Sequence, residues 1–400
     1  MVAGSVGFDF CCDVQPRSSS HNLSGLRLHT SNPSEIRQSL GGVGRNVAMA
    51  CNHLGVSTRL CSIVGRDLPG QTVLEMLRSQ GLSTRGVMSA PDATSRTAQY
   101  VAVNDEKKEL YIAAADMTIL EQMENLGISE RTRSDELAKW IDCLPSWLVV
   151  DGNWSSISAR WWMEAGKALQ ARIAFEPVSV AKCSRFFGGS STGNSDIRMA
   201  TYPNHLIDLM TPNEHELKAI FEAVKASGQC EQEGWFKVIN SFGLSGAVTS
   251  DRLVALTNRE LVTKGIPQQS IQLLPFVPCI VTTLGSKGVL VAQLLRQSDA
   301  RLTSEEAAPY LLSSGTESQT SVGAVYMRLF PPVTHIATES ILSVNGVGDT
   351  FLGAVIAGLV KAPNKNIEDL VDFAQRCAVM SLGSKEAVNP EITSLQENII

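Results

Sequence analysis

The chain has 400 residues, of which 44% are hydrophobic and 18% are charged, with a net charge of −6. This balance argues against a protein that binds nucleic acid through a broad basic face, but it permits a local site for a small anion. The longest apolar runs are far shorter than a membrane-spanning helix, and no N-terminal leader pattern occurs. Nine scattered cysteines without metal-binding spacing are typical of buried thiols in a reducing compartment, so we expect a cytoplasmic protein without membrane segments.

The N-terminal region contains two candidate ligand-binding segments. Residues 2–9 predict a strand with Asp9 at its carboxyl end, where ligands gather in open α/β sheets. A turn-forming role is the alternative for this acid. Gly41, Gly42 and Asn46 then open a predicted helix over residues 47–54, after a polar stretch that we expect to be a loop (21–32). Glycines permit close approach of a ligand to the backbone, and the Asn46 amide can both donate to and accept from a sugar hydroxyl.

A projecting hairpin is predicted next. Residues 60–64 read as a buried strand and 71–80 as a helix, after which two β-type runs follow at 97–103 and 110–115. These runs are either a lid over a site or a plain edge hairpin. We place the lid strands within about residues 8–20 and 96–116.

Regular alternation of strands and helices begins near residue 147. The predicted elements are strands at 147–151, 172–175 and 206–210 and a helix at 157–170. Asn213 and Glu216 follow the third of these strands, three residues apart on one face of a helix start. Their oxygens suit a hydrated Mg²⁺, and a helix-capping pair is the alternative.

The C-terminal part contains a second turn and a glycine-rich helix start. Strands at 279–284 and 289–292 flank the turn Gly285–Gly288, whose backbone and Lys287 could meet a polyphosphate, unless it is a plain hairpin. Around it, residues 242–275 and 296–323 are less regular and predict surface insertions. A short β-type run at 341–344 leads to Gly346, Gly348 and Asp349, then to an apolar helical run (350–360) and a further helix (367–382).

The segment around Asp349 is the strongest candidate for chemistry. Its glycines let successive backbone N–H groups face one small volume, and the helix start adds free N–H groups that suit a phosphate. Asp349 beside such an anion site could act as a base, whereas a helix-capping aspartate is the simpler alternative. Because the following helix is apolar all round, we expect it to be buried.

Five polar clusters fall at or just after predicted strand ends, which one rim of a parallel sheet would bring together. They are Asp9, Gly41–Asn46, the pair Asp151 and Glu176, the pair Asn213 and Glu216, and Gly346–Asp349. Strands that alternate with helices predict an α/β fold, in which a mostly parallel sheet is covered by helices on both faces. We therefore expect a single domain over residues 1–400 with a small β lid and one site at this rim.

Three motifs in this order resemble those of the PfkB family of ribokinase-like carbohydrate and nucleoside kinases. They are the glycine pair Gly41-Gly42 with Asn46, the N-x-x-E motif from Asn213 to Glu216, and the G-x-G-D signature from Gly346 to Asp349. The resemblance covers about residues 1–390 and implies a ribokinase-like fold and ATP-dependent phosphorylation of an alcohol group. Local strings such as Glu176-Pro-Val-Ser179 are most similar to eukaryotic pseudouridine kinases, which are often fused to a pseudouridine-5′-phosphate glycosidase.

The resemblance implies a role for each motif. Asp349 would take the proton from a ribose 5′-hydroxyl, and Mg²⁺ would be held through Asn213 and Glu216. The implied catalytic group is Gly346, Val347, Gly348 and Asp349. The implied nucleoside-binding residues are Asp9, Gly41, Gly42, Asn46, Thr97, Gln99 and Asp116. The implied ATP-binding residues are Asn213, Thr283, Gly285, Lys287, Gly288 and Asn389.

The same resemblance implies the ligands and partners. These are ATP with Mg²⁺, pseudouridine or a related nucleoside, a monovalent cation such as K⁺ whose ligands the sequence does not assign, and a homodimer formed through the lid. Ribose, adenosine or another nucleoside is the rival substrate. A non-catalytic nucleoside-binding protein is a third reading, against which the joint presence of Asp349, Asn213 and Glu216 argues. The sequence fits either a standalone kinase or a kinase domain that works with or is fused to a glycosidase.

Overall fold

A ten-stranded sheet forms the centre of the protein. The computed structural model describes residues 1–15, 29–105, 110–126, 135, 137–138, 144–188, 198–244, 246–314 and 321–399. In spatial order the strands are β13 (Leu311–Ser314), β14 (Val322–Phe330), β12 (Val289–Arg296), β11 (Cys279–Thr283), β10 (Leu209–Met210), β9 (Arg172–Glu176), β8 (Trp147–Asp151), β1 (Val2–Ala3), β4 (Leu60–Val64) and β5 (Val87–Ser89). The seven strands from β11 to β5 pair in parallel, whereas β12, β14 and β13 pair antiparallel, which confirms the predicted mostly parallel sheet.

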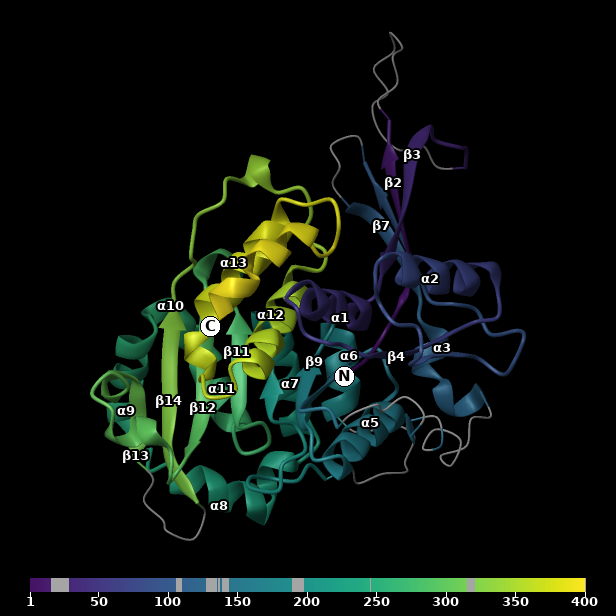
Figure 1. Ribbon diagram of the computed structural model, residues 1–400. Helices are drawn as coiled ribbons and strands as arrows, with labels where there is room; N and C mark the ends of the chain where they lie inside the picture. The colour runs from purple at the N-terminus through teal and green to yellow at the C-terminus, as the bar shows by residue number, and fades with distance from the viewer. Residues whose placement is uncertain are drawn as a thin grey trace.

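Helices cover both faces of this sheet (Figure 1). All five residues of β8 are buried, and they alternate between two cores: Leu148 and Val150 pack on one face, Trp147 and Val149 on the other. The second face is covered by α1 (Val43–His53), α2 (Leu68–Ser79), α12 (Val347–Lys361) and α13 (Val371–Leu382). The first is covered by α3 (Thr118–Glu121), α5 (Ser156–Ala168), α6 (Val180–Phe187), α7 (Glu214–Ala226), α8 (Glu233–Ser241), α9 (Gly246–Leu256), α10 (Arg259–Thr263) and α11 (Ile266–Leu273).

A separate four-stranded sheet projects from this body, at the upper right of Figure 1. Its order is β3 (Ser34–Gly41), β2 (Gly7–Val14), β6 (Gln99–Asn104) and β7 (Leu110–Asp116), and β6 and β7 form the predicted antiparallel hairpin. The predicted strand 2–9 is wrong, because it is two elements, β1 and β2, in different sheets. The backbones of Gly4 and Gly44 approach so closely that a Cβ on Gly4 would lie 2.8 Å from Gly44 Cα, and here the chain leaves the main sheet. Asp9 therefore lies inside a strand of the small sheet.

Other segments also differ from their predicted structure. Residues 341–344 form no strand, because the N–H of Leu342 donates to the carbonyl of Leu382 at the end of α13 rather than to a neighbouring strand. The predicted strand 206–210 shortens to Leu209–Met210. Residues 242–275 contain α9, α10 and α11, which pack onto the core, and residues 296–323 contain β13 and the buried Arg301. Residues 16–28, and with them most of the predicted loop at 21–32 and the predicted lid segment beyond Gln15, lie outside the described residues.

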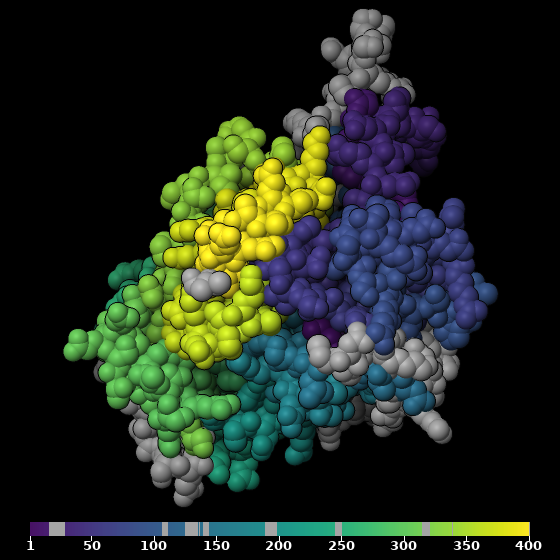
Figure 2. Space-filling model, in the orientation of Figure 1, coloured from purple at the N-terminus to yellow at the C-terminus, as the bar shows by residue number. Residues whose placement is uncertain are grey.

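The two ends of the chain meet around α12. All residues from Asp349 to Leu359 are buried, which confirms the prediction that this apolar helix is a core element. Burial of its large side chains stabilises the fold by about 2 kcal/mol each. Figure 2 shows the C-terminal residues in yellow directly against the N-terminal part in purple and blue. In the parts of the chain that the structure describes, no helix is both long and apolar enough to cross a membrane.

Candidate active site

Asp349 lies in the first turn of α12 and is 8% exposed. The helix begins after Gly346, which has a φ of 75° and lies so close to Ala387 that a Cβ would be 2.3 Å from its carbonyl oxygen. Only glycine fits this position, so the glycine creates the turn that delivers the acid. The free N–H groups of the helix start and a carboxyl group therefore occupy the same small region.

The surroundings of Asp349 shift the pKa of its carboxyl group. Burial, with a smaller contribution from the charges of Asp151, Glu216 and Asp9, raises the pKa of this carboxyl to about 7. The side-chain amide of Asn46 donates to Asp349 Oδ2 over 2.8 Å and opposes the shift. A group that changes its protonation near neutral pH is suited to accept a proton in a reaction. The structure thus brings members of the predicted rim clusters together around Asp349.

Asp9 and the glycine pair form the neighbouring part of the site. Burial raises the pKa of Asp9 to about 6, while the positive charge of Arg45 lowers it. The carboxyl lies against Gly41, where a Cβ would be 2.1 Å from Asp9 Oδ2. Gly42 has a φ of 99° and precedes α1, with its α-carbon against the backbone of Ser5. Both glycines are therefore required by close packing, and together they hold the Asp9 carboxyl next to the helix start.

The small sheet presents different residues to the site than the sequence predicts. Asp9 pairs in register with Tyr100, and Phe8 pairs with Gln99. Because neighbouring strand residues point to opposite faces, Gln99 and its partner Asp116 lie on the face away from Asp9. Tyr100 shares the Asp9 face, and only the pairing of β2 with β6 identifies it. Asp116 forms an ion pair with Arg96 over 2.7 Å.

Thr97 forms hydrogen bonds within the protein. Its side chain is fully buried; it donates to Asp67 and accepts from the N–H of Gly65 over 2.9 Å. The backbone N–H of Thr97 also donates to Asp67 over 2.9 Å. The hydroxyl of Thr97 is therefore used to fix the turn before α2, and the predicted contact between Thr97 and a nucleoside stays a prediction.

A pocket of about 450 Å³ lies beside the start of α12. Its lining combines three of the predicted ATP-binding residues with two residues of the glycine-rich turn: Thr283, Gly285, Gly288, Val347 and Gly348. Most of its remaining wall is apolar, with Phe351 and Val379 among the contributors, and His335 adds a polar group that the sequence analysis missed. An apolar pocket that ends at a helix start suits a nucleotide, whose base is flat and whose phosphates are anionic.

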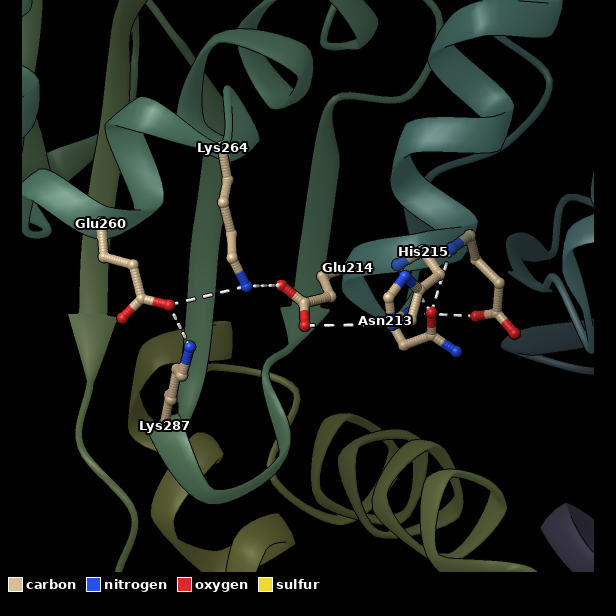
Figure 3. A network of polar contacts seen from close by, with 7 residues as sticks. Asn213, Glu214, His215, Glu260, Lys264 and Lys287 are labelled. Carbon is tan, nitrogen blue, oxygen red and sulfur yellow. Dashed lines mark hydrogen bonds and ion pairs between the residues drawn. The ribbon is translucent and has the colours of Figure 1, made fainter.

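Two predicted ATP-binding residues face elsewhere. Lys287 forms an ion pair with Glu260 on α10, which also lies 3.5 Å from Lys264 (Figure 3). Lys264 continues to Glu214 over 2.8 Å, so the lysine belongs to a surface chain of charges. Asn389 joins the end of α13, where its Nδ2 donates to the carbonyl of Met380 over 3.0 Å.

Asn213 and Glu216 form a reciprocal helix cap. Asn213 Oδ1 accepts from the N–H of Glu216 over 3.0 Å, and Glu216 Oε2 accepts from the N–H of Asn213 over 2.9 Å. Burial raises the pKa of Glu216, and burial together with the charges of Glu216 and Asp349 raises that of Glu176 well above its usual range. Carboxylates that disfavour one another's ionisation fit a cation with oxygen ligands such as Mg²⁺. Among the described residues, no group of three or more His, Cys, Asp or Glu side chains is arranged to bind a metal directly.

Comparison with known proteins agrees with this geometry. Residues 8–129 and 323–394 match the pfkB family of carbohydrate kinases, and these two segments contain Asp9, the glycine pair and Asp349. The chain belongs to this family. Its fold and its candidate site can therefore be compared with those of other pfkB kinases.

The chain is similar to curated relatives and to solved structures. The chain is 32% identical over 399 residues to a pseudouridine-metabolizing bifunctional protein of Schizosaccharomyces pombe, covering 99% of this chain and 47% of that relative. It thus spans about half the length of this relative. It is 25% identical over 231 residues to the pseudouridine kinase of Escherichia coli, covering 58% of this chain and 68% of that one. Among solved structures, a ribokinase of Cryptococcus neoformans in complex with ADP has a TM-score of 0.58 at 19% identity, over 100% of this chain and 98% of that one, which shows the ribokinase-like fold.

Proposed function

We propose that this chain transfers the γ-phosphoryl group of ATP to the 5′-hydroxyl of pseudouridine, giving pseudouridine 5′-phosphate and ADP. The observation that carries the proposal is the position of Asp349. Its neighbours Val347 and Gly348 line the apolar pocket, while its carboxyl lies within reach of the charge of Asp9. A nucleotide in the pocket and a sugar held by Asp9 would therefore meet at a carboxylate with a pKa of about 7.

Each group has a defined task in this transfer. Asp349 accepts the proton of the 5′-hydroxyl as the oxygen attacks the phosphorus. The N–H groups at the start of α12 donate to the transferring phosphoryl oxygens. Asn213 and Glu216 would hold Mg²⁺, which would supply positive charge to the phosphates. Asp9 accepts from two vicinal ribose hydroxyls, which one carboxylate can do at once.

The choice of nucleoside rests on the relatives and on the small sheet. Two of the curated relatives are named as a pseudouridine-metabolizing protein and a pseudouridine kinase. Tyr100, on the Asp9 face, offers an aromatic surface on which a base can stack. Replacement by alanine is expected to raise KM for the nucleoside about tenfold and to leave KM for ribose within about twofold, because ribose lacks the base.

A coupled ADP-release assay tests the proposal with pseudouridine, uridine, adenosine and ribose as acceptors. Turnover of pseudouridine well above uridine is the expected result, because these two differ only in the glycosidic linkage. Preference for another acceptor would correct the substrate and keep the kinase, and turnover of none of the four would contradict the function. Repeating the assay without Mg²⁺, and with Na⁺ in place of K⁺, tests both proposed cations.

The wider setting is also part of the proposal. Because the chain spans about half of its Schizosaccharomyces pombe relative, which is described as bifunctional, it would supply the kinase activity of a protein that also contains, or works beside, a pseudouridine-5′-phosphate glycosidase. We further propose one kinase domain that forms a homodimer through the small sheet in the cytoplasm. Light scattering after size exclusion, at several protein concentrations, measures the oligomeric state.

A further inference from the structure

A cavity of about 360 Å³ lies at the edge of the large sheet opposite the candidate active site. Its lining includes the first residues of four parallel strands, Trp147 of β8, Arg172 of β9, Leu209 of β10 and Cys279 of β11. The candidate active site lies at the other ends of these strands, where β8 ends at Asp151 and β9 at Glu176. None of the residues that line the cavity also lines the pocket beside α12. The cavity is therefore a separate place in the fold.

Two arginines give this cavity positive charge. Arg172 and Arg296 both line it and are exposed, and in the parts of the chain that the structure describes neither forms an ion pair. Arg172 begins β9 and Arg296 ends β12, so the two cations flank the cavity with β10 and β11 between them. The guanidinium of Arg172 lies over the ring of Trp147, 4.9 Å from its centre. Burial raises the pKa of Tyr202, and the neighbouring charge of Arg296 opposes this rise.

The two acids that line the cavity already have cationic partners. Asp208 pairs with Lys167 over 2.6 Å, and Asp299 pairs with Arg301 over 2.8 Å. Both carboxylates are thus neutralised by side chains of the protein, whereas the guanidinium donors are left for a ligand. Guanidinium groups bind phosphate and carboxylate oxygens through charge-assisted hydrogen bonds, so the cavity favours an anion.

Two buried ring nitrogens in the cavity wall have no hydrogen-bond partner among the described residues. They are Nε1 of Trp147 and Nδ1 of His205, in residues that are 5% and 9% exposed. The indole nitrogen only donates. His205 Nε2 lies 3.0 Å from a carboxylate oxygen of Asp208, so Nε2 carries the hydrogen and Nδ1 of the neutral ring only accepts. Because unpaired buried polar groups cost free energy, the wall favours a ligand with both an acceptor and a donor.

The remaining wall suits a flat ring. The ring of Tyr202 stacks on that of His205 with their centres 5.7 Å apart, and Leu294 and Leu359 add apolar surface. A nucleoside monophosphate combines an anionic group, a flat base and base edges that donate and accept hydrogen bonds. The volume of the cavity is in the range of small-molecule sites, whereas a free phosphate would fill only a small part of it.

We propose that this cavity is a second ligand site, which binds a nucleoside 5′-monophosphate. The phosphate pairs with one guanidinium, the base lies against the aromatic wall, and the second guanidinium donates to a carbonyl oxygen of the base. The inference goes beyond the proposed function and does not depend on it. Leu359, which lines the cavity, lies about 15 Å along α12 from Asp349, so a ligand here does not touch the proposed base.

Calorimetric titration with uridine 5′-monophosphate tests the site. Because this nucleotide can also enter the active site, the starting protein is Asp9→Asn, which weakens the proposed sugar contact there. Binding is expected to persist in this variant and to weaken about tenfold or more when Arg172→Gln and Arg296→Gln are added. Arg160→Gln removes an arginine that pairs with Glu164 outside the cavity and is the control, with unchanged affinity. Affinity that depends on Asp9 and not on the two cavity arginines would overturn the proposal.

A second measurement reports on the cavity itself. In protein labelled with ¹⁵N-tryptophan, the indole signal of Trp147 is assigned by its loss in Trp147→Phe. Uridine 5′-monophosphate is expected to shift this signal, whereas uridine and inorganic phosphate should need at least about tenfold higher concentrations, because each lacks part of the ligand. An unmoved signal would contradict the site, and either fragment acting at the concentration of the nucleotide would contradict the class of ligand. Neither measurement needs turnover, so failure of the proposed function and failure of this site are distinguishable.

Discussion

Two buried aspartates at the same rim differ in how fully they are hydrogen-bonded. Asp151, at the end of β8, accepts from the N–H and hydroxyl of Ser5 and from the N–H groups of Gly44 and Asn153. Within the described parts of the chain, Asp349, at the start of α12, accepts from Asn46 alone. Burial raises the pKa of both, so this shift does not distinguish them. The two carboxylates differ in the number of their hydrogen-bond donors. Asp151 has four donors and links β8 to the segment after β1 and to α1. Asp349 has a single donor and can therefore take up a proton from a ligand.

Removal of the base should have the largest effect. Asp349→Asn is expected to lower kcat about 10²- to 10⁴-fold while ATP still binds, because the amide keeps the shape but accepts no proton. The ADP-release assay measures the rate, and calorimetric titration with ATP measures binding. A near-normal rate would mean that Asp349 is not the base.

The matched change at Asp151 should affect the fold instead. Asp151→Asn places an NH₂ group against backbone donors, so the free energy of unfolding is expected to fall by about 2 kcal/mol while kcat stays within about threefold. Urea unfolding and the same kinetic assay give the two values. A large loss of kcat without a loss of stability would reverse the roles that we assign to the two aspartates.

The pH dependence provides a third test of the contrast. Asp349 acts only when it is deprotonated, so kcat/KM should rise with pH up to its pKa of about 7 and level off above it. Below that value the rate should fall about tenfold per pH unit. A profile that stays flat from pH 5 to 8 would contradict the assignment.

Stability should change in the opposite direction. The pKa of Asp349 is raised in the folded state. Its contribution to the free energy of unfolding is therefore fully present below the unfolded-state pKa near 4 and is lost as pH rises through about 7. Asp349→Asn should therefore unfold at a higher temperature than the wild type at pH 8, with a smaller difference at pH 5. Thermal unfolding at the two pH values checks this.

The sequence predicted features that depend on neighbouring residues better than contacts between residues far apart in the chain. The helix starts at Gly42 and Gly346, the α/β alternation and the acid of the glycine-rich turn could be predicted because each depends on neighbouring residues. The bond between Asn46 and Asp349 joins residues 303 positions apart, and no local pattern indicates it. The same limit explains Thr97, whose hydroxyl is used by Asp67 on another segment.

Strand register caused the other differences. Residues 2–9 read as one strand, and only the tertiary structure divides them between two sheets. Once β2 and β6 pair, the alternation of side chains places Tyr100 rather than Gln99 beside Asp9. His335 lies in an irregular segment that lines the pocket, where no periodicity reveals a role.

The turn from Gly285 to Gly288 also contains a group that already has a partner, and here we expect the smallest change in kinetics. Lys287 is exposed and bound to Glu260, so Lys287→Ala should change KM for ATP less than about threefold. Gly288 has a φ of 92°, and a Cβ there would lie 2.0 Å from the carbonyl oxygen of Phe330. Gly288→Ala should therefore distort the pocket wall and raise KM for ATP about tenfold or more. If the lysine variant instead loses ATP affinity, its ammonium leaves Glu260 to bind the phosphates, and the ion pair in Figure 3 belongs only to the nucleotide-free protein.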